Sequence, residues 1–137
     1  MHDSVLWSAR LAASVLVPPL RFLESQSVKS DSHGSAVGYD AGKNIKGRKR
    51  HLLVDTLGLV LGVLVTAANV PEREGGQTLL GRTLKWFAWL RLLWVDGGYS
   101  GPDFAQGVRG LSPKARQMRL TACRDKPQRW AIVRVLQ

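Results

Sequence analysis

The acidic residue Asp96 ends an apolar run and stands directly before two glycines, in the stretch LLWVDGGYSG. Functional groups of open α/β sheets gather at the carboxyl ends of strands, so a carboxylate there is well placed to bind a ligand. Hard divalent cations prefer such oxygen ligands, and the glycines let a ligand approach the backbone closely. Asp96 is therefore a candidate metal ligand; the alternative is a carboxylate that only caps a helix or turn.

A cluster of cationic side chains lies upstream of this acid, where glycines punctuate the chain. Its members are Lys43, Lys46, Arg48, Lys49 and Arg50. The whole sequence carries 20 Lys and Arg against 10 Asp and Glu, a formal net charge of +10, which favours a polyanionic partner such as nucleic acid. We expect this cluster to contact DNA phosphates, which positions DNA without reading its sequence. The alternative is a solvated face with no partner.

Apolar runs and turn residues predict the elements that must position these groups. The 137 residues, 45% of them hydrophobic, suffice for one domain with a core. Asp55 and Gly58 in DTLG indicate the turn of an antiparallel hairpin. The pattern predicts strands at 20–27, 51–54, 59–66 and 90–96, a loop at 30–47, and helices at 72–87 and from about 102, with Ser100 as its cap. This order predicts a mixed α/β fold.

The two ends of the chain differ from this middle part. We expect an atypical N-terminal segment at 1–19, a short helix closed by two prolines, and a basic, divergent tail at 111–137. The N-terminal segment lacks the basic start and the cleavage site of a signal peptide, and no apolar run is long enough to cross a membrane. Cys123 is the sole cysteine, which excludes an intrachain disulfide and suits a reducing cytosol.

Aromatic and histidine side chains have structural interpretations beside functional ones. Tyr99 could stack on a base or pack beneath the site, and the sequence does not separate the two. We expect His51 to have a structural role at the start of a strand. The aromatic residues expected to pack in the core are Trp86, Phe87, Trp89 and Trp94.

Three stretches together carry more information than any one of them. They are LESQSVKS at 23–30, GYDAGKNIKGRKRHLLVDTLGLVLGVLVTAANV at 38–70 and LLWVDGGYSG at 92–101. In this order and spacing they closely resemble the DDE transposases of bacterial insertion sequences. The resemblance covers roughly residues 22–107. It implies an RNase H-like mixed sheet with a β-hairpin and flanking helices, here incomplete at the C-terminus, as a partial catalytic domain at 20–110.

The resemblance also implies a catalytic metal centre. In the family three acids bind two divalent ions, normally Mg²⁺ with Mn²⁺ as a substitute, which activate the attacking oxygen and stabilise the leaving one. The second family acid falls on Asp96. The first, an Asp before SQS, falls on Glu24 in LESQS, which keeps the charge but adds one methylene. The implied catalytic and metal-binding residues are therefore Glu24 and Asp96.

The third family acid has no counterpart in this sequence. It is a Glu on a downstream helix, whereas here no Glu follows Glu74 and the only acids after Asp96 are Asp103 and Asp125. Asp103 lies too close to Asp96 in sequence to replace it. We therefore expect a truncated or frameshifted copy with impaired catalysis.

The leading hypothesis is an insertion-sequence transposase that binds DNA and performs metal-dependent cleavage and strand transfer. The alternative is a non-catalytic basic DNA- or RNA-binding fragment. The expected partners are the transposon ends, with a homo-oligomer left open and no membrane, and the expected location is the bacterial cytoplasm, at the nucleoid. The expected DNA contacts are Lys29, Lys43, Lys46, Arg48, Lys49, Arg50 and Tyr99.

Overall fold

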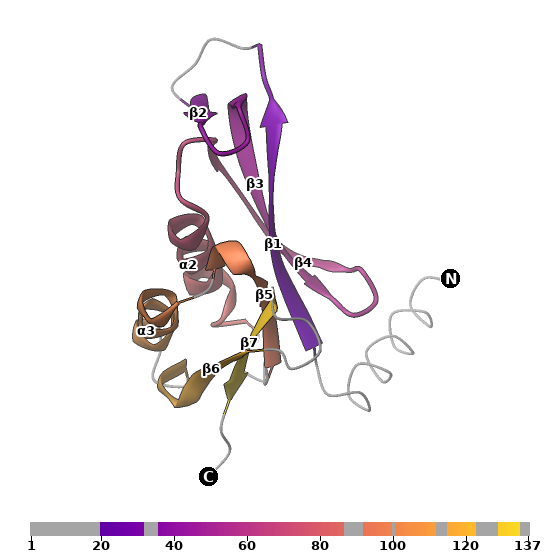
Figure 1. Ribbon diagram of the computed structural model, residues 1–137. Helices are drawn as coiled ribbons and strands as arrows, with labels where there is room; N and C mark the ends of the chain where they lie inside the picture. The colour runs from indigo at the N-terminus through magenta and orange to yellow at the C-terminus, as the bar shows by residue number, and fades with distance from the viewer. Residues whose placement is uncertain are drawn as a thin grey trace, which may run out of the picture.

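The fold is built around one mixed β-sheet. The computed structural model describes residues 20–31, 36–86, 92–99, 101–111, 115–122 and 129–134. In these residues seven strands form one sheet in the order β2-β3-β1-β5-β7-β6, with β4 also paired to β3 (Figure 1). The strands are β1 (Leu20–Lys29), β2 (Gly38–Asp40), β3 (Ile45–Asp55), β4 (Val60–Ala67), β5 (Leu92–Asp96), β6 (Met118–Ala122) and β7 (Arg129–Arg134).

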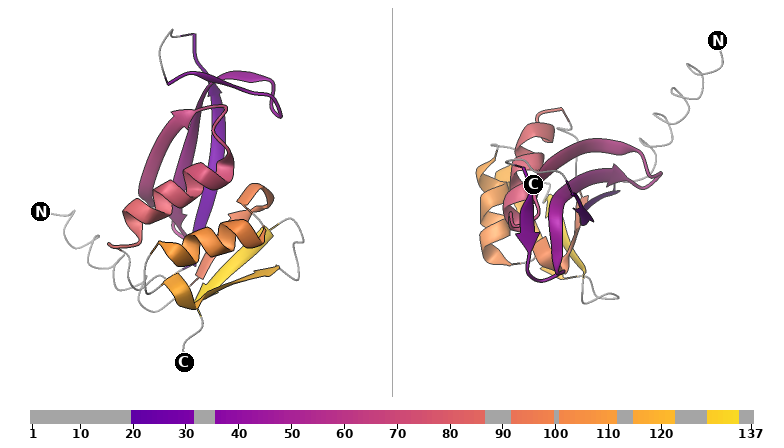
Figure 2. Two further views of the ribbon diagram at one scale, coloured as in Figure 1. Left: turned by 90° about the vertical axis from the view of Figure 1, so that its left-hand side faces the viewer. Right: turned by 90° about the horizontal axis from the view of Figure 1, so that it is seen from above.

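Two α-helices lie on the same side of this sheet. They are α2 (Glu72–Thr83) and α3 (Pro102–Gly110), and short 3₁₀ turns, η1 (Gly97–Tyr99) and η2 (Ala115–Gln117), follow β5 and precede β6. Figure 2 shows both helices against one face of the sheet, which we call the helix face. We call the other side the open face, because no helix of the described residues covers it. The mixed α/β fold is thus confirmed, and it fits the RNase H-like architecture.

The predicted hairpin is present, with β3 and β4 paired antiparallel. The Asp55 carboxylate accepts hydrogen bonds from the backbone N–H groups of Leu57 and Leu59, at 2.8 and 2.9 Å. Gly58 has a φ of 78°, a conformation that a side chain disfavours. The role of Asp55 in the turn is therefore confirmed, and its carboxylate sets the geometry of the hairpin.

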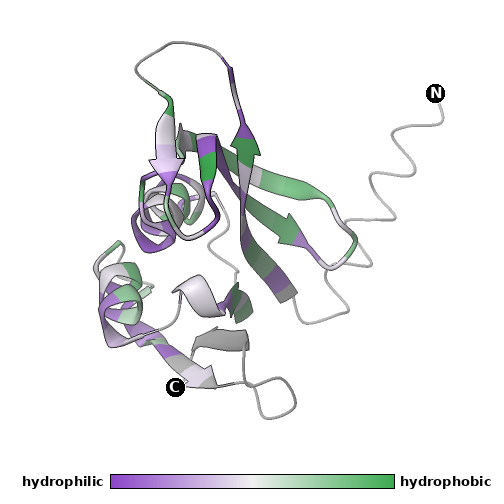
Figure 3. Cartoon of the chain, turned by 45° about the horizontal axis from the view of Figure 1, so that its top comes forward, coloured by the Kyte–Doolittle hydropathy of each residue, from purple (hydrophilic) through white to green (hydrophobic). Residues whose placement is uncertain are grey.

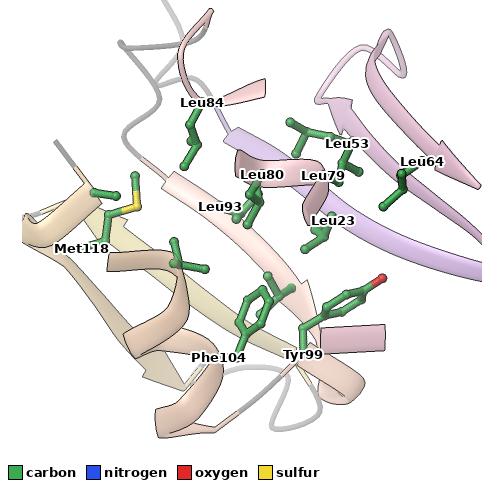
Figure 4. Packing of buried hydrophobic residues seen from close by; sticks show 13 residues of the cluster. Leu23, Leu53, Leu64, Leu79, Leu80, Leu84, Leu93, Tyr99, Phe104 and Met118 are labelled. Atoms are coloured by element: carbon green, nitrogen blue, oxygen red, sulfur yellow. The ribbon is translucent and has the colours of Figure 1, made fainter. Parts of the chain in front are cut away.

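The hydrophobic core fills the space between the helix face and the helices (Figure 4). Each of the central strands supplies alternate side chains, since residues two apart in a strand point to the same face. The buried cluster consists of Leu23, Leu53, Leu64, Leu79, Leu80, Leu84, Leu93, Val95, Tyr99, Phe104, Val108, Ala115 and Met118. Strand β4 is coloured mostly as hydrophobic in Figure 3, and its residues Val63 and Val65 are half exposed.

Several expectations about element bounds need correction. The loop expected at 30–47 contains β2 and the start of β3. The helix expected to reach residue 87 ends at Thr83, and Leu84, its C-cap, donates its backbone N–H to the Leu80 carbonyl. The N-cap of α3 is Gly101, not Ser100 as expected. Trp86 is not in the core: it lies after the helix end, 72% exposed, beside the Lys85 ammonium.

The structure describes part of the tail but not the N-terminal segment. Residues of the tail form β6 and β7, which extend the sheet beyond β5. The helix expected in segment 1–19, the core positions of Phe87 and Trp89, and Cys123 lie outside the described residues. No helix in the described ranges is long and apolar enough to cross a membrane.

Candidate metal and DNA site

The pairing of two strands brings the two candidate acids together. β1 and β5 run parallel, with Phe22 opposite Trp94 and Leu23 opposite Val95. Glu24 and Asp96 are the next residues along each strand. Neighbouring strands lie about 4.8 Å apart, and residues at one level of a parallel pair share a face. Leu23 and Val95 are buried on the helix face, so both acids point to the open face, where both are exposed.

A pocket of about 310 Å³ contains both acids. It is lined by Phe22, Leu23, Glu24, Ser25, Trp94, Val95 and Asp96. The backbone N–H of Gly97 donates to Asp96 Oδ1 at 2.6 Å, which orients the carboxylate. Phe22 was not predicted to line a site, and Trp94, expected in the core, instead lies half-buried in this pocket. Both placements depend on the β1–β5 register, which no local sequence pattern reveals.

The donor set fits one divalent ion rather than a complete two-metal centre. Mg²⁺ is commonly bound by one or two carboxylates together with water and substrate phosphates, and Glu24 and Asp96 match that pattern. Within the described segments no group of three or more His, Cys, Asp or Glu side chains could hold a metal. A third acidic ligand, as the resemblance implies, is therefore not found in the described part of the chain.

A row of cations lies on the same face as the acids. Lys46, Arg48 and Arg50 occupy alternate positions of β3 and are all exposed. Arg50 is paired with Gln26 across β1, and its guanidinium hydrogen-bonds to the Gln26 side chain. Glu24 is two residues before Gln26 and therefore shares its face. We call the side chains of Lys46, Arg48 and Arg50 the cation row. Lys29, at the end of β1, is also exposed.

Two other members of the expected basic cluster do not join this row. Lys49 occupies an intervening position of β3, so it points to the helix face, where it is buried. Its ammonium lies 3.3 Å from the Asp40 carboxylate and donates to the Val70 carbonyl at 3.0 Å. Lys43, in the turn before β3, forms an ion pair with Glu72 at 2.9 Å. Lys49 is thus inaccessible to DNA, and Lys43 is already paired with a carboxylate.

Tyr99 and His51 lie on the helix face. Tyr99 is completely buried, so of the two alternatives its ring packs beneath the site and does not reach a base. His51 is also completely buried, which fits a structural role. Its Nδ1 lies 3.3 Å from the Tyr99 hydroxyl, and its Nε2 lies 3.1 Å from the Thr66 hydroxyl.

The electrostatics of the helix face follow from these contacts. Burial lowers the pKa of His51, and the positive charge of Lys49 lowers it further. Burial raises the pKa of Glu72, but hydrogen bonds from Lys43 and Ser25 and the nearby ammonium charges outweigh it, so the net pKa is below the ordinary value. A hydrogen bond from Ser27 is the main cause of the lowered pKa of Asp40. The imidazole is thus neutral, and both carboxylates are ionised, near neutral pH.

The fold agrees with a comparison to known protein families. The family model for the transposase DDE domain matches residues 16–130. The chain belongs to the DDE transposase family. No curated protein matches the sequence significantly, and neither does any solved structure. The function of this family is DNA transposition; its members bind DNA and generally use a divalent metal.

Protonation of His51 should make this transposase domain less stable in mild acid. Because folding lowers the pKa of His51, the unfolded chain binds more protons below the ordinary pKa of about 6.5. The contribution of His51 to the free energy of unfolding is fully present above that pH and is lost as the pH drops from 6.5 toward the folded pKa. We expect urea unfolding to show this loss between pH 7.5 and 5.5, and His51→Gln to remove most of it.

The carboxylates on the same face provide an internal control for this measurement. The pKa values of Asp40 and Glu72 are lowered, so their contribution is lost only below about pH 4.5. If the His51→Gln variant lost as much stability as the wild type between pH 7.5 and 5.5, the assignment to His51 would be contradicted.

Proposed function

We propose that this transposase domain holds one divalent ion, Mg²⁺ or Mn²⁺, between Glu24 and Asp96 and binds the ends of a bacterial insertion sequence. The observation that carries the proposal is the shared pocket of the two acids, on the same face as the cation row. Its place of action would then be nucleoid DNA in the bacterial cytoplasm.

The cation row is suited to follow a nucleic-acid backbone. Alternate residues of a strand lie about 6.6 Å apart, so the row from Lys46 to Arg50 extends for about 13 Å. Leu52 follows Arg50 on this face and is paired with Glu24 across β1. A DNA strand bound along β3 would therefore reach the acid pocket one step beyond Arg50. By the alternation of β1, Lys29 points to the opposite side from Glu24 and Gln26, so it would not extend this row.

The division of chemical roles follows from this placement. A bound ion would supply positive charge at the phosphate to be attacked and would acidify a water molecule. Glu24 and Asp96 hold their oxygens toward that position, and the cation row holds the neighbouring phosphates. Because Glu24 is one methylene longer than the Asp that the resemblance implies at this position, we infer DNA binding with weak cleavage.

Removing two members of the cation row should weaken DNA binding in a salt-dependent way. Each lost phosphate contact lowers the slope of log affinity against log salt by about 0.9 on duplex DNA. The double variant Arg48→Ala/Arg50→Ala should therefore reduce the slope by about 1.8, measured by fluorescence anisotropy across a KCl series. The control Arg82→Ala removes an exposed charge of α2, on the helix side, and should leave the slope unchanged.

Two outcomes would contradict the DNA proposal. One is an equal loss of slope in the Arg82→Ala control, which would indicate a diffuse charge effect. The other is a preference for RNA over duplex DNA that is indifferent to Mg²⁺, which would favour a basic RNA-binding protein.

Asp96→Asn should remove most of the metal binding, since it replaces an ionic ligand by a neutral one. We expect Mn²⁺ affinity, measured by electron paramagnetic resonance, to fall by at least about tenfold. Glu74→Gln makes the same change of charge at an exposed position of α2 and should leave the affinity unchanged. Equal affinities of the wild type and Asp96→Asn would contradict the metal site.

The same proteins also test the proposed weakness of cleavage. A Mg²⁺-dependent nicking assay on transposon ends should give little product with the wild type. Glu24→Asp, which restores the shorter acid of the family, should raise the rate, because a misplacement of about 1 Å can cost about a hundredfold. Efficient strand transfer by the wild type, abolished by Asp96→Asn, would overturn this part of the proposal.

A further inference from the structure

The turn that follows Asp96 is rich in glycine, yet it is anchored at one end. Gly97 and Gly98 have no side chains to pack, and η1 ends at Tyr99. The Tyr99 ring packs against Phe104 of α3, with ring centroids 5.6 Å apart (Figure 4). A Cβ on Gly76 of α2 would lie 2.6 Å from the same ring, so glycine there makes room for it. The ring therefore holds the turn between the two helices.

Hydrogen bonds fix the hydroxyl end of the same side chain. The Tyr99 hydroxyl lies 3.3 Å from His51 Nδ1, and the Ser25 side chain also hydrogen-bonds to Tyr99. Ser25 is paired with His51 across β1 and β3. Ser25 directly follows Glu24, and Tyr99 lies three residues after Asp96. The hydroxyl thus connects the backbone segments that carry both acids.

His51 is itself held in a single orientation. Its Nε2 lies 3.1 Å from the Thr66 hydroxyl on β4, and its ring packs against Gly75, where a Cβ would clash with it. Burial and the charge of Lys49 keep the imidazole neutral, so one ring nitrogen donates and the other accepts. His51 therefore offers Tyr99 a partner at a fixed position.

We propose that the Tyr99–His51 hydrogen bond positions the Asp96 carboxylate, making both residues positioning residues for the metal site. The link is the turn: Gly97 donates its N–H to Asp96 Oδ1 at 2.6 Å, so an anchored turn fixes the carboxylate. Outer-shell partners of metal ligands contribute about 10-fold to 100-fold in metal affinity. This inference deepens the proposed function and rests on it as far as metal binding is concerned.

Tyr99→Phe tests the inference, because it keeps the ring and removes only the hydroxyl. Two quantities are measured on the full chain: Mn²⁺ affinity by electron paramagnetic resonance, and amide hydrogen exchange of Gly97 without metal. We expect affinity to fall by about 10-fold or more. We expect the Gly97 amide to exchange about tenfold faster, the effect of one lost hydrogen bond.

Further variants separate positioning from a general loss of stability. Leu64→Val removes one methylene from the core on β4 and should leave both quantities unchanged. His51→Gln should resemble Tyr99→Phe, and the double variant should be no worse than either one, since all three remove the same link. Additive effects in the double variant would overturn the proposal.

The two readouts distinguish this inference from the proposed function. A wild type that binds no Mn²⁺ would contradict the metal site, and the exchange rate of Gly97 would still decide whether Tyr99 anchors the turn. Unchanged Gly97 exchange in Tyr99→Phe would overturn the positioning role, whatever the metal affinity.

Discussion

The parallel pairing of β1 with β5 is the constraint on which the site depends. Leu23 and Val95 lie opposite each other in the core, and this fixes the register of the two strands. A shift of β1 by one residue would turn Leu23 outward and carry Glu24 to the helix face. The hydrophobic core therefore determines that two negative charges meet at the open face, where water or a metal ion can offset their repulsion.

The same alternation separates the positive charges of β3 into two groups with different roles. Lys49 points inward and, with Asp40 and the Val70 carbonyl, connects β3 to β2 and to the start of α2. Arg48 and Arg50 point outward, where their charge adds to the positive surface beside the acids. A dense run of cations thus supplies both an internal ion pair and a candidate surface for DNA.

The sequence was sufficient for the hairpin and for the strands β1, β4 and β5, because apolar runs and turn residues are local signals, whereas β2, β6 and β7 were not predicted. It was insufficient for Lys49, because β3 begins six residues before the apolar run that predicted it, and the alternation could not be assigned there. The Tyr99–His51 contact joins residues 48 positions apart. Such a contact depends on the packing of α2 against the sheet, which no spacing in the sequence encodes.

The most direct test of the account is the position of a bound ion. Anomalous diffraction from crystals of the protein soaked in MnCl₂ would locate manganese without reference to activity. The account predicts one peak between the carboxylates of Glu24 and Asp96, on the open face of the sheet. A peak on the helix face beside Glu72 or Asp40, with none between Glu24 and Asp96, would contradict it.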